Sequence, residues 1–220
     1  NELQAGRPDY LSQSFAAVSV AEPAADFSQP ELNAGDLCYL MFTSGSSGTP
    51  KGVEVTHGNV AGLIVNIQNE LRVSASDRWS ALHSSAFGFS LWEIWGALSI
   101  GAALEIVPAE QRADPWEWDS QLRKAGVSVL SLTPSGLRQW LASGCAGVWA
   151  ELRLVVLSGE PMTPEDAAAW FEHQAALDDG PPRLINTYAL TETAGRVAMT
   201  EVLPGQSVAI LGSAVSDAEL

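Results

Sequence analysis

Positive charge is scarce in this sequence, because 11 lysines and arginines stand against 26 acidic residues and leave a net charge of −15. An acidic excess of this size repels nucleic acid and anionic membrane surfaces, so neither is expected as a partner. A bound polyphosphate would need local positive groups and Mg²⁺ to offset the acidic field. We interpret the acidity mainly as a means of keeping the protein soluble.

Cysteine is scarce too, and long apolar runs are missing. Cys38 and Cys145 form neither a disulfide framework nor a metal-binding spacing, and Cys38, in an apolar run, is expected to be a small core residue. The longest apolar region, residues 91–108, contains Glu93 and Glu105 and is not expected to span a membrane. With no secretory signal recognised, we expect a reducing, cytoplasmic setting.

Strand and helix patterns alternate along most of the 220 residues. The segment up to about residue 35 is rich in Ala, Pro, Ser and acidic residues, so we expect an extended linker at 1–35 and a core at 36–220. The alternation predicts an α/β fold of layered sheets with flanking helices as crossovers. Expected strands cover residues 37–42, 79–83, 103–107, 127–132, 152–157, 183–188 and 196–202, the first of them buried. Expected helices cover residues 59–71, 91–101, 115–126, 134–142 and 163–177.

The most informative loop runs from Thr43 to Gly52, between an apolar strand and a helix pattern that begins near His57. Its glycines allow close backbone approach to an anion, its hydroxyls and N–H groups donate hydrogen bonds, and Lys51 adds a point charge. It is not a Walker A motif, because Pro50 precedes the lysine and a glycine follows it. We predict a phosphate-binding loop rather than a flexible linker.

Since ligands of open α/β sheets bind beyond strand carboxyl ends, the loops after residues 42, 83, 132, 157 and 188 are candidates for one shared site.

The longer string YLMFTSGSSGTPKGV, residues 39–53, resembles the phosphate-loop signature of adenylate-forming enzymes. These are the adenylation domains of nonribosomal peptide synthetases, acyl-CoA synthetases and firefly luciferase. Residues 186–192, NTYALTE, are similar to the family's Asn-x-Tyr-Gly-x-Thr-Glu signature, with Ala189 in place of the usual Gly. Residues 83–98 and 132–138 resemble the peptide-synthetase subgroup more than acyl-CoA synthetases. The resemblance covers the chain from about residue 35 to the end.

This resemblance implies site residues for ATP, Mg²⁺ and a carboxylic-acid substrate. The residues implied for phosphate binding are Thr43, Ser44, Gly45, Ser46, Ser47, Gly48, Thr49 and Lys51. Those implied for adenine binding are Ser158, Gly159, Glu160, Asn186 and Tyr188, with Tyr188 stacked on the ring. Those implied for catalysis are Lys51, Thr191 at the α-phosphate and Glu192 as the Mg²⁺ ligand. Taken alone, residues 157–161 would be an ordinary strand-to-helix turn.

The acyl-substrate pocket carries the main departure from the family pattern. By resemblance its lining is His83, Gly88, Phe89, Trp92, Ser131, Val156, Ser158, Thr187, Gly195 and Arg196. The family usually has Asp, which holds the substrate's α-ammonium, where this chain has Gly88. A buried ammonium without an anionic partner costs on the order of several kcal/mol, so an α-keto or α-hydroxy acid is favoured over an α-amino acid. Two alternatives remain: Glu93 replaces the missing acid, or the domain is degenerate. Arg196 either pairs with a substrate carbonyl or carboxylate or has a surface role.

The implied reaction is attack of the substrate carboxylate on the α-phosphorus of ATP, with loss of Mg-pyrophosphate. The acyl group then passes from the adenylate to a phosphopantetheine thiol on a carrier domain, as in natural product and depsipeptide biosynthesis.

The family's earlier N-terminal portion, its Tyr-Arg-Thr-Gly-Asp segment and its small C-terminal subdomain are not found in the sequence. We therefore expect the middle of an adenylation core, acting with the rest of the adenylation domain and synthetase. Keto-acid modules interrupted by a ketoreductase resemble this case. A non-catalytic scaffold is the alternative from a different functional class.

Overall fold

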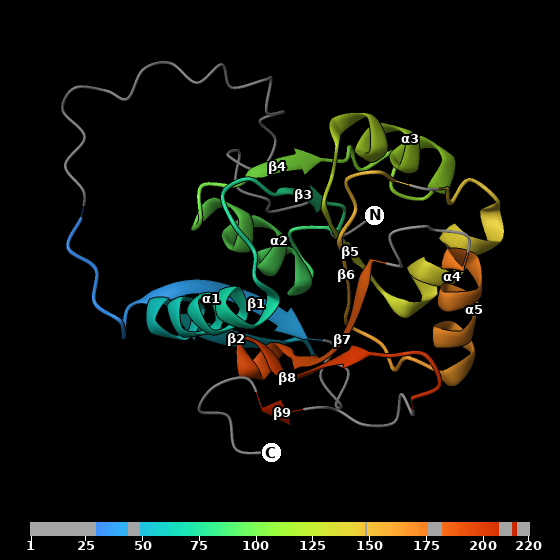
Figure 1. Cartoon of the computed structure of the whole chain (residues 1–220). Helices are drawn as coiled ribbons and strands as arrows, with labels where there is room; N and C mark the ends of the chain where they lie inside the picture. Colours follow the sequence, from blue (N-terminus) through green and yellow to red (C-terminus); the bar gives the residue numbers. More distant parts are fainter. Residues whose placement is uncertain (1–29, 44–48, 148, 176–181, 207–212, 215–220) are drawn as a thin grey trace, which may run out of the picture. The chain divides into compact units, whose positions relative to one another are not determined.

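The computed structural model describes residues 30–43, 49–147, 149–175, 182–206 and 213–214. The chain divides into two units, Asn1–Leu32 and Asn33–Leu220, and the described helices and strands all belong to the second (Figure 1). Residues 1–29 lie outside the described residues. The linker expected over residues 1–35 therefore stays a prediction.

The second unit contains two sheets among its described residues. The small one pairs β1 (Leu37–Thr43) with β2 (Lys51–Thr56) in antiparallel fashion. The large one has the strand order β4-β3-β5-β6-β7-β8-β9. Its strands are β3 (Arg78–Ala81), β4 (Ala103–Ile106), β5 (Val129–Leu132), β6 (Leu154–Leu157), β7 (Arg183–Leu190), β8 (Gly195–Val202) and β9 (Ser213–Ala214). Pairing is parallel from β4 to β7 and antiparallel from β7 to β9.

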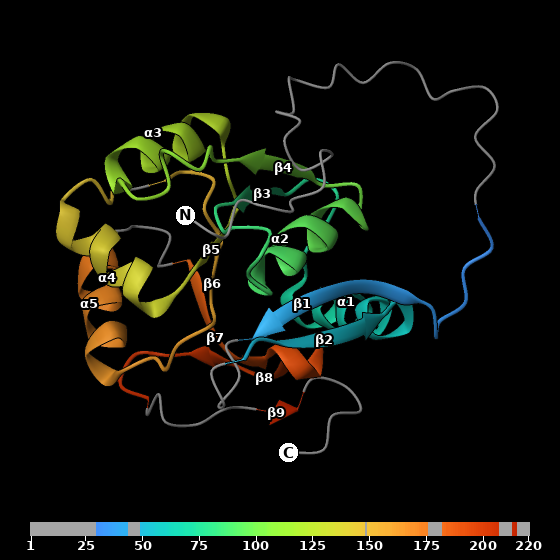
Figure 2. The same cartoon turned by 180° about the vertical axis from the view of Figure 1, so that it is seen from behind.

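Helices connect the parallel strands and cover both faces of the large sheet. They are α1 (His57–Leu71), α2 (Phe89–Leu98), α3 (Pro115–Ala125), α4 (Pro134–Ser143) and α5 (Pro164–Gln174), with a 3₁₀ turn η2 (Thr191–Thr193). Figure 2 shows α3, α4 and α5 on one side and α1 and α2 on the other. The predicted α/β fold with flanking helices is confirmed.

Side chains of the central strands point alternately to the two faces of the large sheet, and each face has its own hydrophobic core. In β6, Val155 and Leu157 pack in the cluster that holds the tryptophans of α3, α4 and α5, whereas Leu154 and Val156 pack with residues of α1 and α2. Successive side chains of a strand point to opposite faces, so a fully apolar strand serves both layers. Gly96 of α2 lies so close to β3 that an added Cβ would sit 2.6 Å from the Trp79 ring.

Local signals set the helix ends much as the sequence predicts. The Thr163 side chain accepts a hydrogen bond from the Asp166 amide, and the Asp166 side chain accepts one from the Thr163 amide, which makes a capping box at the start of α5. Pro115 occupies the first turn of α3, and Gly126 ends it at a left-handed φ of 71°. The expected end of α5 near residue 177 lies outside the described residues.

The expected strand–loop–helix around the phosphate loop is wrong in two respects. Strand β2 stands between the loop and α1, so the loop closes a β-hairpin and Lys51 is the first residue of β2. The strand at 37–42 is also not buried as a whole, because Met41 is buried while Leu40 and Phe42 are 49% and 65% exposed. A two-stranded ribbon presents two faces, and only one of them packs against α1 through Val55 and Val60.

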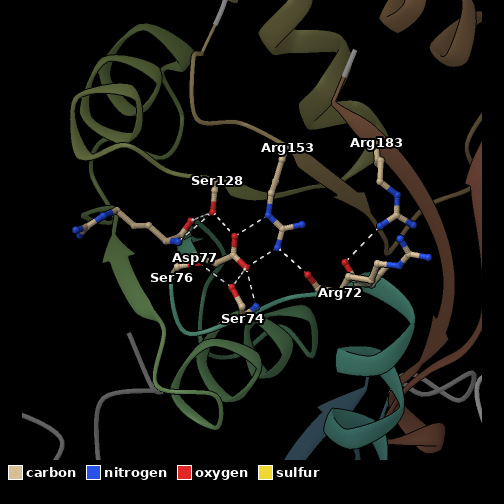
Figure 3. A network of polar contacts seen from close by, with 9 residues as sticks. Arg72, Ser74, Ser76, Asp77, Ser128, Arg153 and Arg183 are labelled. Carbon is tan, nitrogen blue, oxygen red and sulfur yellow. Dashed lines mark hydrogen bonds and ion pairs between the residues drawn. The ribbon is translucent and has the colours of Figure 1, made fainter. Parts of the chain in front are cut away.

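A buried carboxylate connects the amino-terminal ends of β3, β5 and β6 (Figure 3). Asp77 accepts hydrogen bonds from Arg153 Nε at 2.7 Å, Ser128 Oγ at 2.7 Å and the Ser74 amide at 2.8 Å, and it pairs with Arg153 Nη2. Burial by itself would raise the pKa of Asp77. The hydrogen bonds and the Arg153 charge outweigh it and hold the pKa of this carboxyl below its ordinary value. Arg153 also donates to the carbonyl of Arg72, which ties the end of α1 to β6.

Candidate functional site

A largely apolar pocket brings together four separate parts of the chain. Strand β1, the start of α2, the turn after β6 and the end of β7 with η2 all contribute to it, together with Leu63 of α1. Six lining residues belong to the predicted site: Gly88, Phe89, Trp92, Ser158, Gly159 and Thr191. Three of the five loops expected to share a site, those after residues 83, 157 and 188, therefore meet here, beside the strand that leads into the loop after residue 42.

Six further lining residues were not predicted: Tyr39, Met41, Leu63, Phe87, Ala189 and Leu190. A signal existed for two of them, since Tyr39 and Met41 are two positions apart in β1 and share one face. Burial raises the pKa of Tyr39 to about 12, with a smaller contribution from Cys38. Its hydroxyl is therefore neutral at physiological pH and can donate a hydrogen bond into an apolar setting.

Two glycines shape the pocket in different ways. Gly159 has a φ of +90°, and an added Cβ would lie 2.7 Å from the Phe87 ring, so any other residue here would be strained and would displace that ring. Gly88, the N-cap residue of α2, has ordinary helical φ and ψ. The described residues that line the pocket include no charged side chain.

Glu93, the acid suggested as a replacement, is bonded outside the first pocket in the described structure. Its side chain is fully buried on α2 and is absent from the pocket lining. One carboxylate oxygen, Oε1, accepts from the Leu82 amide at 3.2 Å and lies 2.9 Å from His83 Nδ1, while Oε2 accepts from the His83 amide at 3.2 Å. Both oxygens are thus already occupied in holding the chain that follows β3.

His83 was predicted in the acyl pocket but lines a second, more polar pocket. Other residues of this second pocket include Arg112, Thr133 and Ser135. The imidazole also contacts the first pocket's wall, with ring centroids 5.6 Å from Phe87 and 4.8 Å from Phe89. The loop after residue 132 thus contributes to the second pocket and not to the first.

Five other predicted residues lie in the strands or the turn beside the first pocket without lining it. Ser131 is fully buried in β5, opposite Val156 of β6, and its hydroxyl has no hydrogen-bond partner within the described chain. Thr187 Oγ1 donates to the Leu157 carbonyl at 2.7 Å, which links β7 to β6. Asn186 is buried in β7. Glu160 accepts hydrogen bonds from the Ser135 amide and hydroxyl at the start of α4, so its carboxylate has a structural partner.

Of the expected phosphate and metal residues, Thr43 is half-buried, and the others are exposed or lie outside the described residues. Lys51 pairs with Thr43 across the hairpin and is exposed, as is Thr49, whereas Ser44 to Gly48 lie outside the described residues. Glu192 is exposed in η2, and η2 contacts β2, the strand that begins at Lys51. Tyr188 is 40% exposed in β7. The side chain of Arg196 lies outside the described part of the structure; the backbones of Gly195 and Arg196 pair with Leu190 and Ala189.

Neither a preformed metal cluster nor a membrane span is found in the described part of the chain. No group of three His, Cys, Asp or Glu side chains is placed to hold a metal. A lone exposed carboxylate such as Glu192 is compatible with Mg²⁺, which usually takes one or two carboxylates plus substrate phosphates. None of the described helices is both long and apolar enough to cross a bilayer.

Comparison with known proteins gives a consistent relationship. The sequence model described as AMP-binding enzyme matches residues 4–220. Syringomycin synthase SyrB1 of Pseudomonas syringae pv. syringae is 39% identical over 184 residues, which cover 83% of this chain and 29% of that protein. The L-proline--[L-prolyl-carrier protein] ligase of Streptomyces coelicolor is 36% identical over 166 residues, 74% of this chain and 30% of the relative. The chain thus spans less than a third of either relative.

A solved structure matches the fold. It is the Vibrio cholerae adenylation domain AlmE in complex with glycyl-adenosine-5'-phosphate, with a TM-score of 0.73 at 24% identity. The match covers 84% of this chain and 34% of that one. At this identity the likeness concerns the fold alone.

Proposed function

This chain belongs to the AMP-binding enzyme family, and from that premise we propose that its protein activates a carboxylic acid with ATP as an acyl adenylate. The observation that carries the proposal is the meeting of separate motifs at one place. Gly88, Gly159 and Thr191, from three segments far apart in the sequence, line one pocket, and its β1 wall leads directly into the phosphate loop. An acid in the pocket and a triphosphate at the hairpin would have their reacting ends near Thr191.

The proposed chemistry requires positioning and charge neutralisation. The substrate carboxylate is itself the nucleophile, so no general base is needed. Lys51 at the start of β2 and Thr43 opposite it would hold the β- and γ-phosphates, and the Thr191 hydroxyl would bind the α-phosphate. Mg²⁺ held by Glu192 would neutralise charge on the leaving pyrophosphate. Tyr188 would offer its exposed ring to adenine.

The acid is proposed to be an α-keto or α-hydroxy acid. An α-ammonium entering this pocket would lose hydration and meet no anionic side chain among the described lining residues, because position 88 is glycine and the Glu93 oxygens are already bonded. A carbonyl or hydroxyl loses far less on the same transfer. The apolar walls, among them Phe89 and Trp92, favour an apolar side chain on the acid.

The proposed partners follow from the relatives. One is named as a ligase that acts on a carrier protein, so we propose that the acyl adenylate is passed to a phosphopantetheine thiol of a carrier domain. The rest of an adenylation domain and a larger synthetase would supply the remaining ATP contacts.

The test is ATP–pyrophosphate exchange by the full protein that contains this chain, with a panel of acids matched in side chain. For each side chain the panel holds the α-keto, α-hydroxy and α-amino acid. We expect exchange with the first two to exceed exchange with the third. An amino-acid preference would refute the substrate proposal, and no exchange with any acid would indicate a non-catalytic scaffold.

A further inference from the structure

We propose that Glu93 is a positioning residue. Its hydrogen bonds hold the imidazole of His83 in one orientation, between the apolar first pocket and the more polar second pocket. The effect expected on kcat rests on the proposed function. The hydrogen bonds between the buried carboxylate of Glu93 and His83, whose ring contacts both pockets, do not depend on that function. Neither Glu93 nor its bonds to His83 are part of the phosphate, adenine or metal residues described above.

The carboxylate of Glu93 lies where a free charge would be unfavourable. It is fully buried, and a buried carboxylate without donors costs several kcal/mol. Two backbone amides, of Leu82 and His83, donate to it at 3.2 Å. An ionised carboxylate can only accept hydrogen bonds, so in this proposal His83 Nδ1 donates across the 2.9 Å that separate it from Oε1 of Glu93.

The same contact fixes the ring in place. The backbone of His83 and its Nδ1 are bound to one side chain, so rotation of the imidazole breaks a hydrogen bond to a buried acceptor. Phe87 and Phe89 pack against the ring from the apolar pocket. The imidazole is 13% exposed and contributes to the polar pocket beside Thr133 and Ser135. His83 therefore separates an apolar space from a polar one, and Nε2 is the ring nitrogen left for a ligand.

A double-mutant cycle in the full protein tests the coupling. Glu93→Gln keeps the shape but replaces one acceptor oxygen by a donor, and His83→Phe keeps the ring contacts but removes Nδ1. We expect each single variant to lower kcat of ATP–pyrophosphate exchange about tenfold, because a displaced pocket wall would hold the acid less precisely in line with the α-phosphorus. The kcat of the double variant should be no lower than that of the slower single variant, since the second change removes an interaction already lost.

A double variant whose loss in kcat is the product of the two single losses would overturn the proposal, because Glu93 would then act through the Leu82 and His83 amides alone. Glu117→Gln, an exposed carboxylate on α3, is the matched control.

A second measurement does not depend on activity. The chain has three histidines, so ring-nitrogen NMR of the ¹⁵N-histidine-labelled chain is simple to assign, with His83→Phe identifying the His83 signals. We expect Nδ1 of His83 to carry a proton in the wild-type chain at neutral pH. An unprotonated Nδ1 would overturn the proposal even if the acid-activating function holds. A protonated Nδ1 together with no exchange activity would leave the Glu93–His83 contact standing while the proposed function fails.

Discussion

A Cβ atom added at Gly88 would lie 3.6 Å from Sδ of Met41, and apart from its chain neighbours and its own helix no other heavy atom of the described residues would lie within 4 Å. This is an ordinary van der Waals separation, and the backbone of Gly88 is helical. The pocket therefore has room for a side chain at this position. The pocket has no charged side chain at position 88 because the residue is glycine, and not because a carboxylate would fail to fit.

Gly88→Asp should change the preferred substrate class. A carboxylate at this position would pair with an α-ammonium, so we expect amino-acid exchange to rise at least tenfold relative to the matched keto acid, equivalent to about 1.4 kcal/mol. The measurement is the ratio of kcat/KM values in pyrophosphate exchange. Gly88→Asn is the control for size. Equal ratios for the Asp and Asn variants would show that charge at this position does not select the substrate.

Lys51→Ala should weaken the use of ATP. The ammonium group is exposed at the start of β2, and a hydrogen bond from a charged donor is worth about 1.5–3 kcal/mol, so we expect KM for ATP to rise about tenfold or more. KM for the acid should change much less. Lys124→Ala, an exposed lysine at the end of α3, is the matched control. ATP kinetics like those of the wild type would remove Lys51 from the phosphate site.

Ser131→Ala distinguishes a hydroxyl that awaits a ligand from one that is merely buried. Ser131 and Ser90 both have buried hydroxyls without a hydrogen-bond partner in the described chain. Removing either should leave the free energy of unfolding unchanged or raise it by about 1 kcal/mol. Only Ser131→Ala is expected to raise KM for the acid, because Ser131 and its β6 neighbour Val156 are both predicted to contact the acid, whereas Ser90 is not. Equal KM values in the two variants would count against Ser131 as a substrate contact.

Asp77→Asn should destabilise the fold in a pH-dependent way. The folded-state pKa of Asp77 is lowered, so its contribution is complete above the unfolded value of about 3.9 and is lost as the pH falls through the folded value. At pH 7 we expect a loss of about 2 kcal/mol, since the change removes hydrogen bonds to a charged acceptor, while the Arg153 side chain, 37% exposed, can regain hydration. Thermal unfolding followed by circular dichroism should show a constant difference from pH 7 to 5 that shrinks below about pH 4. Glu151→Gln, at an exposed turn, is the control; a difference independent of pH would contradict the assignment.

Much of the fold was predictable because its signals are local. The apolar run of β6 requires cover on both faces, and the cap at Thr163 and the glycine at 126 mark helix ends by backbone chemistry alone. Strand β2 was missed because Lys51 and Gly52 were assigned to the loop, although Val53 and Val55 already alternate with polar residues. The burial of β1 was overestimated, because the sequence does not reveal that β1 pairs only with β2 or that one face of this ribbon is exposed.

The site was predictable as a set of segments but not as a set of side-chain directions. Gly88, Gly159 and Thr191 do meet, because parallel strands bring their carboxyl ends to one edge. The hydrogen bonds of Glu160 to α4, of Thr187 to β6 and of Glu93 to His83 depend on neighbours that are distant in sequence. No motif distinguishes a polar side chain that faces a ligand from one that holds two strands together.

The hairpin of β1 and β2 makes pocket composition depend on strand register. Tyr39 and Met41 face the pocket, whereas Leu40 and Phe42, one position along, are exposed on the opposite face. A slip of one residue between β1 and β2 would exchange these two pairs. The length of the Gly/Ser-rich loop between Thr43 and Lys51 therefore sets which β1 side chains face the pocket, in addition to the phosphate binding proposed for it. An insertion or deletion in that loop would alter substrate selection and nucleotide binding together.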